Sequence, residues 1–379
     1  MTNYRLTPLK NTEENRQRII EKTRGNMQKP PIKKPSKTWV PVVITTIALF
    51  MAVFLAVPYV QQAFFDEQNF TIEKVVIPNV QYTSLVDSTY LDETNEFIYN
   101  TENGFFAFDV ETQGETLLVD TSEIARVFDY AVSKDWLVWA QPVNNERKIH
   151  VLNRETHEVN IMETPYFYGI QLQGDTVVYT GFQDNKPYTF TLNLNDGTSQ
   201  ILREIEGEGS SSWLAFEGNQ VVFSEVFKME DGKNTVVTVH DLEMKKKLES
   251  YVFPYDIAEN ILLKGDKIYS YLWNENDDEP AAIGFIDRTT GDFNVIEKSV
   301  GIHDYATDGE HFAVAVEKGE SNTVQLFALQ EGELKLLSKL PSIRERLVLP
   351  RFTEQGTLVV NGEGMDKAMY LIRFNKESK

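Results

Sequence analysis

The sequence contains no cysteine among its 379 residues. This absence excludes disulfide bonds, thiolate metal sites, a cysteine nucleophile and a lipid-bearing cysteine. The motifs HExxH and Gly-x-Ser-x-Gly and the phosphate-binding P-loop are also missing. No two of the five histidines are three or four residues apart, so no helical metal pair forms. We therefore expect no metal, no cofactor and no catalytic residues.

Basic residues are scarce and unevenly placed. Lys and Arg number 37 against 57 Asp and Glu, a formal net charge of −20. A nucleic-acid binder needs a dense basic surface, so we expect no nucleic-acid partner. Residues 1–38 hold ten basic and three acidic residues, whereas residues 61–379 hold 27 basic and 54 acidic ones. The chain thus has a basic amino-terminal segment and an acidic remainder.

An uncharged stretch separates these two parts. No charged residue occurs between Lys37 and Asp66, and the 22 residues Trp39–Val60 are almost all apolar. As a helix they extend roughly 33 Å, enough to cross the ~30 Å hydrocarbon core of a bilayer. The stretch predicts a transmembrane helix at residues 39–60 in contact with membrane lipid. The positive-inside rule then places residues 1–38 in the cytoplasm and the domain 61–379 outside the cell membrane.

Alternatives remain both for the apolar stretch and for the role of residues 1–38. A cleaved signal peptide has a shorter basic region and an apolar run of about 7–15 residues, so it fits less well. Residues 1–38 are interpreted either as a topology signal or as a docking peptide for a cytoplasmic partner.

The exterior part repeats a turn followed by a β-rich run. The repeats begin near residues 95, 135, 175, 219, 266, 310 and 356, and in four of them a glycine precedes the turn residue. A second strand–turn–strand pattern follows each of the first six by about 10–20 residues. Each unit therefore holds four short strands, and units of about 40–45 residues are typical of propeller blades.

The sequence thus predicts an all-β, seven-bladed β-propeller after one transmembrane helix, with six or eight blades as alternatives. The last blade lacks room for its outer strand, which we expect residues 70–78 (FTIEKVVIP) to supply. Such closure removes an open sheet edge. A pair of β-sandwiches is a weaker alternative, because sandwiches do not predict a steady period.

The turn between the two outer strands of a blade carries a resemblance. Phe285-Ile286-Asp287-Arg288-Thr289-Thr290-Gly291 has the pattern hydrophobic-Asp-x-x-Thr-Gly, and Phe108–Gly114 has it with one insertion. In this the chain resembles the propellers of the TolB-like and quinoprotein-like (outer-membrane assembly lipoprotein) groups over residues 86–374. The resemblance implies the fold and little about function, because this turn is a structural device. The quinone and metal residues of true quinoproteins do not occur as a set.

Propeller topology indicates where a ligand would bind. Connections between blades and between second and third strands emerge on one face, which is expected to collect aromatic, arginine and acidic side chains. The candidates for this ligand face are Tyr166, Tyr168, Trp213, Phe253, Tyr255, Trp273, His303, Asp304, Arg344 and Arg346. His150, His157 and His240 lie on or beside outer strands, and we expect them at the surface.

The function that these features favour is non-enzymatic. We expect a single-pass envelope protein whose exterior propeller acts as a binding or scaffolding module for a protein, peptide or glycan. One alternative is a transmembrane regulator of the anti-sigma kind, with a sensor propeller outside and a partner for residues 1–38 inside. Another is an envelope hydrolase or lyase on a propeller scaffold.

Overall fold

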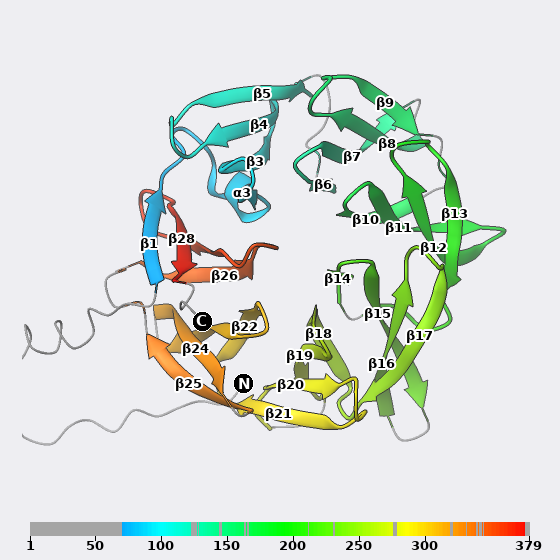
Figure 1. Ribbon diagram of the computed structural model, residues 1–379, viewed down its shortest axis with the longest axis vertical. Coiled ribbons are helices and arrows are strands. Elements are labelled where there is room, and N and C mark those ends of the chain that lie inside the picture. The colour runs from blue at the N-terminus through cyan, green and yellow to red at the C-terminus, as the bar shows by residue number, and fades with distance from the viewer. Residues whose placement is uncertain are drawn as a thin grey trace, which may run out of the picture. The chain divides into compact units, whose positions relative to one another are not determined.

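A computed structural model gives the fold of residues 70–375 (Figure 1). Short segments within this range lie outside the described residues: 123–126, 128, 144–145, 163, 165–166, 211, 230–231, 276–278, 319–320, 331, 339, 341–342 and 344. The predicted cytoplasmic segment and membrane span also lie outside the described residues. Within the described part, no helix is long and apolar enough to cross a membrane.

The described chain forms seven four-stranded antiparallel sheets around a central axis, which confirms the predicted seven-bladed propeller (Figure 1). Blade 1 contains β2 (Thr89–Leu91), β3 (Glu96–Thr101), β4 (Gly104–Asp109) and β5 (Glu115–Asp120). Blade 2 contains β6 (Tyr130–Val132), β7 (Trp136–Val143), β8 (Glu146–Asn153) and β9 (Val159–Met162). Blade 3 contains β10 (Phe167–Gln173), β11 (Thr176–Gln183), β12 (Lys186–Asn193) and β13 (Ser199–Glu204).

The second half of the ring continues in the same order. Blade 4 contains β14 (Ala215–Glu217), β15 (Gln220–Met229), β16 (Gly232–Asp241) and β17 (Lys246–Phe253). Blade 5 contains β18 (Ile257–Lys264), β19 (Lys267–Trp273), β20 (Ala282–Asp287) and β21 (Phe293–Lys298). Blade 6 contains β22 (Ile302–Thr307), β23 (His311–Lys318), β24 (Ser321–Gln330) and β25 (Glu333–Ser338). Blade 7 contains β26 (Leu347–Phe352), β27 (Leu358–Gly362), β28 (Met369–Phe374) and, from the start of the described chain, β1 (Phe70–Val75).

Strand β1 closes the ring as predicted. It pairs antiparallel with β28, from Phe70 opposite Phe374 to Val75 opposite Met369. The rings of Phe70 and Phe374 lie 5.9 Å apart, and Arg373 forms an ion pair with Glu73 at 2.6 Å. Both ends of the propeller domain are therefore held in one sheet, in which β1 is the outermost strand and covers the outer edge of β28.

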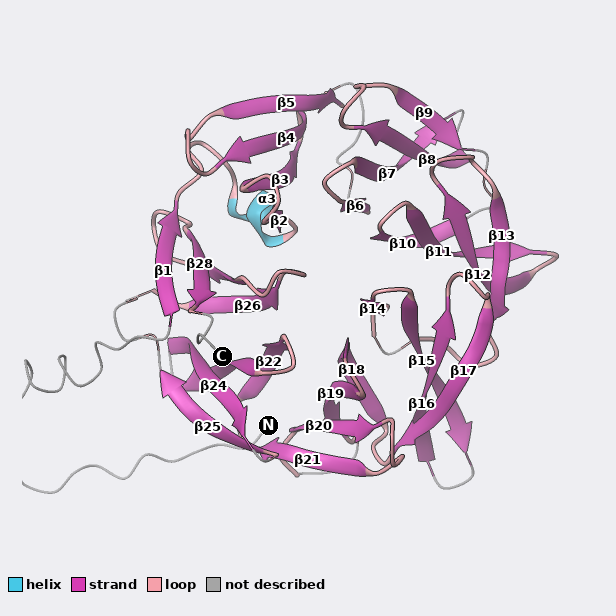
Figure 2. Cartoon of the chain, in the orientation of Figure 1, coloured by secondary structure: helices cyan, strands magenta, loops and turns pink. Residues whose placement is uncertain are grey.

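The hydrophobic core lies between neighbouring sheets and not inside any one of them. Each of the seven blade-to-blade interfaces has its own cluster of buried apolar side chains. Middle strands are covered on both faces, and the consecutive residues Phe97–Asn100 of β3 are all buried. This two-sided burial explains why these strands are continuous apolar runs rather than alternating ones. Figure 2 shows how completely strands make up the ring.

Two histidines are buried between blades, which corrects the expectation that they lie at the surface. His150 is 5% exposed and stacks on Trp139 at 5.2 Å, and His240 is 6% exposed and meets Phe223 edge-on at 5.2 Å. Both lie on third strands, which pack against the neighbouring blades. His157 is exposed, as expected, in a turn.

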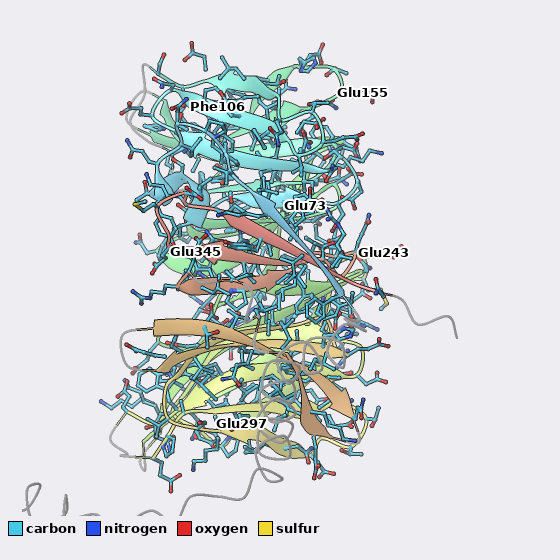
Figure 3. All side chains as sticks on the ribbon, turned by 90° about the vertical axis from the view of Figure 1, so that its left-hand side faces the viewer. Glu73, Phe106, Glu155, Glu243, Glu297 and Glu345 are labelled. Carbon is cyan, nitrogen blue, oxygen red and sulfur yellow. The ribbon has the colours of Figure 1, made fainter. Side chains whose placement is uncertain are left out.

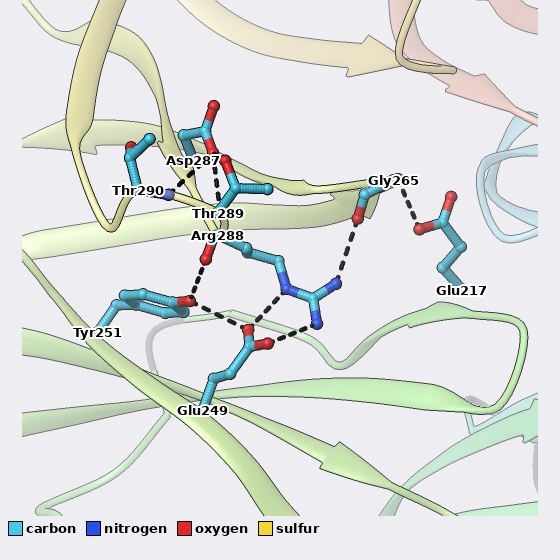
Figure 4. A network of polar contacts seen from close by, with 8 residues as sticks. All are labelled: Glu217, Glu249, Tyr251, Gly265, Asp287, Arg288, Thr289 and Thr290. Carbon is cyan, nitrogen blue, oxygen red and sulfur yellow. Dashed lines mark hydrogen bonds and ion pairs between the residues drawn. The ribbon is translucent and has the colours of Figure 1, made fainter.

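The turn that carries the resemblance is held by its own side chains. Asp287 Oδ1 accepts hydrogen bonds from the backbone N–H of Thr289 at 2.9 Å and its hydroxyl at 2.6 Å. Gly291 takes a φ of 77°, which glycine adopts without steric cost. Arg288 projects from this turn to the preceding blade, where its guanidinium binds Glu249 in a two-pronged ion pair, at 2.7 and 3.1 Å (Figure 4). Such pairs are strong and directional, so this turn both reverses the chain and joins two blades.

The two faces of the ring differ in their connections. Seen edge-on in Figure 3, Glu345, which precedes β26, lies at one face, whereas Glu155 and Glu243, both in turns between third and fourth strands, lie at the other. This is the arrangement expected from four-stranded blades. The short helix α3 (Tyr82–Val86), which is not among the elements predicted from the sequence, follows β1 and lies on the inner side of the ring (Figure 1).

Candidate functional site

The innermost strands of blades 3, 5, 6 and 7 share an irregularity near their first residues. Their pairing register shifts at Tyr168/Ile170, Glu259/Leu262, Ile302/Asp304 and Val348/Arg351. A β-bulge of this kind inserts residues without ladder partners and redirects neighbouring side chains. Because inner strands begin at the face of the inter-blade connections, these bulges surround the axis on that face.

The bulge of blade 5 is held by blade 6. Asn260 takes a φ of 47°, a left-handed conformation that asparagine tolerates better than most residues. Its side-chain amide donates to Asp304 Oδ1 at 2.9 Å and to the carbonyl of Tyr305 at 2.7 Å. The hydroxyl of Tyr305 donates back to the carbonyl of Asn260 at 2.8 Å. Three hydrogen bonds thus offset a backbone strain of about 1–3 kcal/mol.

Blade 4 contributes the opposite side of the same bulge. Ile261 donates its backbone N–H to Ser212 Oγ at 2.9 Å, and the N–H of Ser212 donates to Ser224 Oγ at 3.1 Å. Next to Ser212, the indole of Trp213 is 71% exposed. A large aromatic side chain in that position provides an apolar surface for a ligand.

These elements line an open cavity of about 710 Å³. Its volume is in the range of small-molecule binding sites. Blades 4 to 7 and α3 contribute the lining, which includes Val86, Ser212, Trp213, Glu259, Asn260, Tyr271, His303, Asp304, Pro350 and Arg351. A second cavity of about 310 Å³ is lined by the later residues of the inner strands and shares Leu214, Asn260, Leu262, Pro350 and Arg351 with the first. We call the 710 Å³ space the axial cavity.

Arg351 lies where the two cavities meet. Its Nη1 donates to the carbonyl of Leu349 at 3.1 Å and to Asn361 Oδ1 at 2.7 Å, and its Nη2 donates to the carbonyl of Ser88 at 3.1 Å. All three acceptors are neutral. Burial lowers the pKa of Arg351 to about 10, so the guanidinium remains charged at neutral pH.

Asp304 is the acidic group of the axial cavity with the largest change in pKa. Burial raises the pKa of Asp304 to about 6, against the opposing effects of hydrogen bonds from Tyr305 and Asn260 and of the Arg351 charge. The backbone N–H of Tyr305 donates to Asp304 Oδ1 at 2.8 Å, so the hydrogen bonds of this carboxylate within the described chain converge on one oxygen. A carboxyl with a displaced pKa in a cavity marks a candidate binding or catalytic group.

The structure brings some of the predicted residues together and separates others. Trp213, His303 and Asp304 line the axial cavity. Arg346 lines an adjoining cavity of about 390 Å³ together with His303 and Asp304, and forms an ion pair with Glu363 at 3.0 Å.

Other predicted residues do not contribute to the cavity. Phe253 is fully buried in the interface of blades 4 and 5 and is therefore not on the ligand face. Tyr255 packs edge-on against Phe293 at 6.0 Å, and Trp273 pairs with Ile257 at the end of β19. Tyr166 and Arg344 lie outside the described residues, and Tyr168 is placed by its backbone pairing with Thr180.

Asn260 and Arg351 are not among the residues predicted from the sequence. One signal in the sequence pointed to each of them. Asparagine is over-represented at left-handed positions, and Pro350 next to Arg351 marks a bulge, since proline interrupts a strand ladder. Within the described residues, no group of three or more His, Asp or Glu side chains is placed to hold a metal ion.

Comparisons with known proteins give the fold. No family model matches the chain, and no curated protein matches it. The β-propeller domain of the Trilobed protease from Pyrococcus furiosus matches with a TM-score of 0.51 and 13% identity, over 66% of this chain and 81% of that one. An acylaminoacyl peptidase in complex with Z-Gly-Gly-Phe-chloromethyl ketone matches with a TM-score of 0.51 and 15% identity, over 66% of this chain and 46% of that one.

TolB from Acinetobacter baumannii also matches, with 10% identity over 64% of this chain and 60% of that one. Its TM-score of 0.40 is too low to support an argument. The chain spans less than two thirds of the length of the peptidase and of TolB. At such identities a match carries information about architecture and not about activity. The described part of the chain is a seven-bladed β-propeller similar to other propeller proteins.

Proposed function

We propose that this chain is a single-pass membrane protein whose propeller, outside the membrane, binds a ligand in the axial cavity without transforming it. One observation carries the proposal: bulges on separate blades direct Asn260, Asp304 and Arg351 to one cavity, beside the exposed ring of Trp213. Polar groups collected at the axis are typical of recognition.

The surroundings of the polar groups support binding rather than chemistry. The hydroxyl of Ser210 contacts Ser224 Oγ at 3.0 Å, and the hydroxyl of Ser212 accepts from the backbone of Ile261. Neither hydroxyl contacts a histidine in the described chain, as an activated serine would.

The membrane part of the proposal is supported by the sequence of residues 1–60. Alkaline extraction of cell membranes tests it: the full chain should stay in the pellet, and a chain without residues 39–60 should not. Protease added to intact cells should digest the propeller and spare residues 1–38. Release of the full chain by alkali would contradict the proposed anchor.

Crosslinking in intact cells tests ligand binding. The full chain is compared with Trp213→Ala, whose side chain is too exposed for its loss to unfold the protein, and with Val252→Ala as a control. Val252 is a similarly exposed apolar residue on the outer strand β17. We expect Trp213→Ala to lose the captured species and Val252→Ala to keep it. A chain without residues 1–28 should also keep it, whereas a regulator of a cytoplasmic partner would lose function.

A further inference from the structure

Arg351, which is half-buried, differs from the well-buried arginines of the described chain. Arg154, Arg203 and Arg288 have side chains that are about one tenth exposed, and they pair with Glu96, Glu225 and Glu249 respectively. Within the described chain, no carboxylate oxygen lies within the 4.0 Å of an ion pair from the guanidinium of Arg351.

A half-buried guanidinium that contacts no carboxylate can still pair with an anion. The charge of Arg351 is solvated by two carbonyls and an amide oxygen, and these bonds occupy only part of its five N–H donors. The carboxylates of Asp304 and Asp87 act on this charge without touching it, and an anion in direct contact with the guanidinium would add charge-assisted hydrogen bonds. Because Arg351 lines the axial cavity, a ligand entering the cavity can supply that anion.

The other side chains that line the axial cavity restrict the chemical class of the ligand that carries this anion. Asp304 and Glu259 line the same cavity, so the side chains around Arg351 do not form a strongly positive site. Such a site disfavours a doubly charged phosphate and accepts a single carboxylate. Asp304 and Asn260 offer side-chain oxygens to hydroxyl donors, and Trp213 offers an aromatic face to the C–H groups of a ring.

We propose that the ligand of the axial cavity is a sugar acid: a polyhydroxylated ring whose carboxylate pairs with Arg351 and whose hydroxyls donate to Asp304. This rests on the proposed function, because it assigns a ligand class to the same cavity. The guanidinium holds the carboxylate by two parallel hydrogen bonds. The hydroxyls donate to the other carboxylate oxygen of Asp304, since Asn260 and Tyr305 both donate to Oδ1.

Calorimetric titration of the purified full chain tests this assignment with three probes: glucuronate, glucose and inorganic phosphate. We expect glucuronate to bind at least about 10-fold more tightly than glucose, because only glucuronate brings a carboxylate that forms an ion pair with Arg351. Inorganic phosphate should not displace glucuronate at equal concentration. Equal affinity for glucuronate and glucose would overturn the assignment, and so would displacement by phosphate, which would indicate a general anion site.

Substitutions locate the interaction. Arg351→Gln should remove the advantage of glucuronate over glucose, whereas Arg351→Lys, which keeps the charge without the fork, should keep part of it. Arg373→Gln is the matched control, since Arg373 lies on β28 and pairs with Glu73 away from the axial cavity. An unchanged ratio of glucuronate affinity to glucose affinity in Arg351→Gln would overturn the assignment. If that variant fails to fold, the ratio in Arg351→Lys is compared with the wild-type ratio, and an unchanged ratio there would overturn the assignment.

Failure of this inference is distinguishable from failure of the proposed function. If Trp213-dependent crosslinking persists while glucuronate does not bind, the cavity binds another class of ligand and the sugar-acid assignment is wrong. If glucuronate binds through Arg351 but Trp213→Ala leaves the crosslinked species unchanged, the captured species binds elsewhere and the proposed function is wrong.

Discussion

Replacing Asp304 by asparagine should stabilise the protein at neutral pH. The carboxyl of Asp304 lies at the wall of the axial cavity, and burial raises its pKa from 3.8 to about 6. The substitution keeps the side-chain shape and an oxygen that accepts from Tyr305 and Asn260. What it removes is the charge.

The direction of the effect follows from proton linkage. The folded state of the wild type holds the Asp304 proton more tightly than the unfolded state does. The resulting stabilisation is present below about pH 4 and is lost as the pH rises through about 6. A difference of about two pKa units corresponds to about 3 kcal/mol. At pH 7 the free energy of unfolding of the wild type is therefore expected to be up to about 3 kcal/mol lower than that of Asp304→Asn.

Urea unfolding of the full chain, followed by tryptophan fluorescence at several pH values from 4 to 7.5, measures this difference. The two unfolding free energies should be close near pH 4 and should diverge as the pH rises, with the variant more stable. Other titrating groups are common to both proteins and cancel in the difference. Glu111→Gln, an exposed change in a turn, serves as the control and should parallel the wild type.

Two outcomes would contradict this prediction. One is a difference between wild type and Asp304→Asn that stays constant across the pH range. The other is a variant that is less stable than the wild type at pH 7. If the expected result is found, Asp304 is a residue that costs stability and faces a cavity, which is a pattern typical of binding residues.

Three further outcomes are expected. Phe70→Ala should cost about 3–5 kcal/mol, because a buried ring is lost from the strand that closes the propeller, whereas the exposed neighbour Thr71→Ala should cost little in the same unfolding assay. Arg288→Ala should cost about 1.5–3 kcal/mol by removing a two-pronged ion pair with Glu249, and a cost near zero by thermal unfolding would show that blades 4 and 5 do not depend on it. Burial lowers the pKa of His240 to about 4, so stability is lost as the pH falls from about 6.5 toward 4. His240→Phe should weaken this loss of stability. An unchanged dependence of the unfolding free energy on pH would contradict the prediction.

The blade count and the closure of the ring followed from local features of the sequence. Turn residues such as Gly265 and Asp287–Gly291 act within a few positions, and they recur at nearly constant spacing because every blade has the same four-strand plan. The missing outer strand of the last blade left one place for residues 70–78. The repeat period and the turn residues depend on local sequence and not on how neighbouring blades pack. They can therefore be recognised in the sequence alone.

The composition of the axial cavity was decided by tertiary structure. Asn260, Asp304 and Arg351 lie on three different blades, and the bulges that direct them to the axis are held by bonds between blades. The burial of individual side chains was not predictable from the sequence either. Phe253 was predicted on the ligand face and His240 at the surface, yet both are covered by neighbouring sheets. A sequence repeat specifies the strands of each blade, but the direction of a side chain at the axis depends on how adjacent blades meet, because the stabilising contacts there join residues distant in sequence.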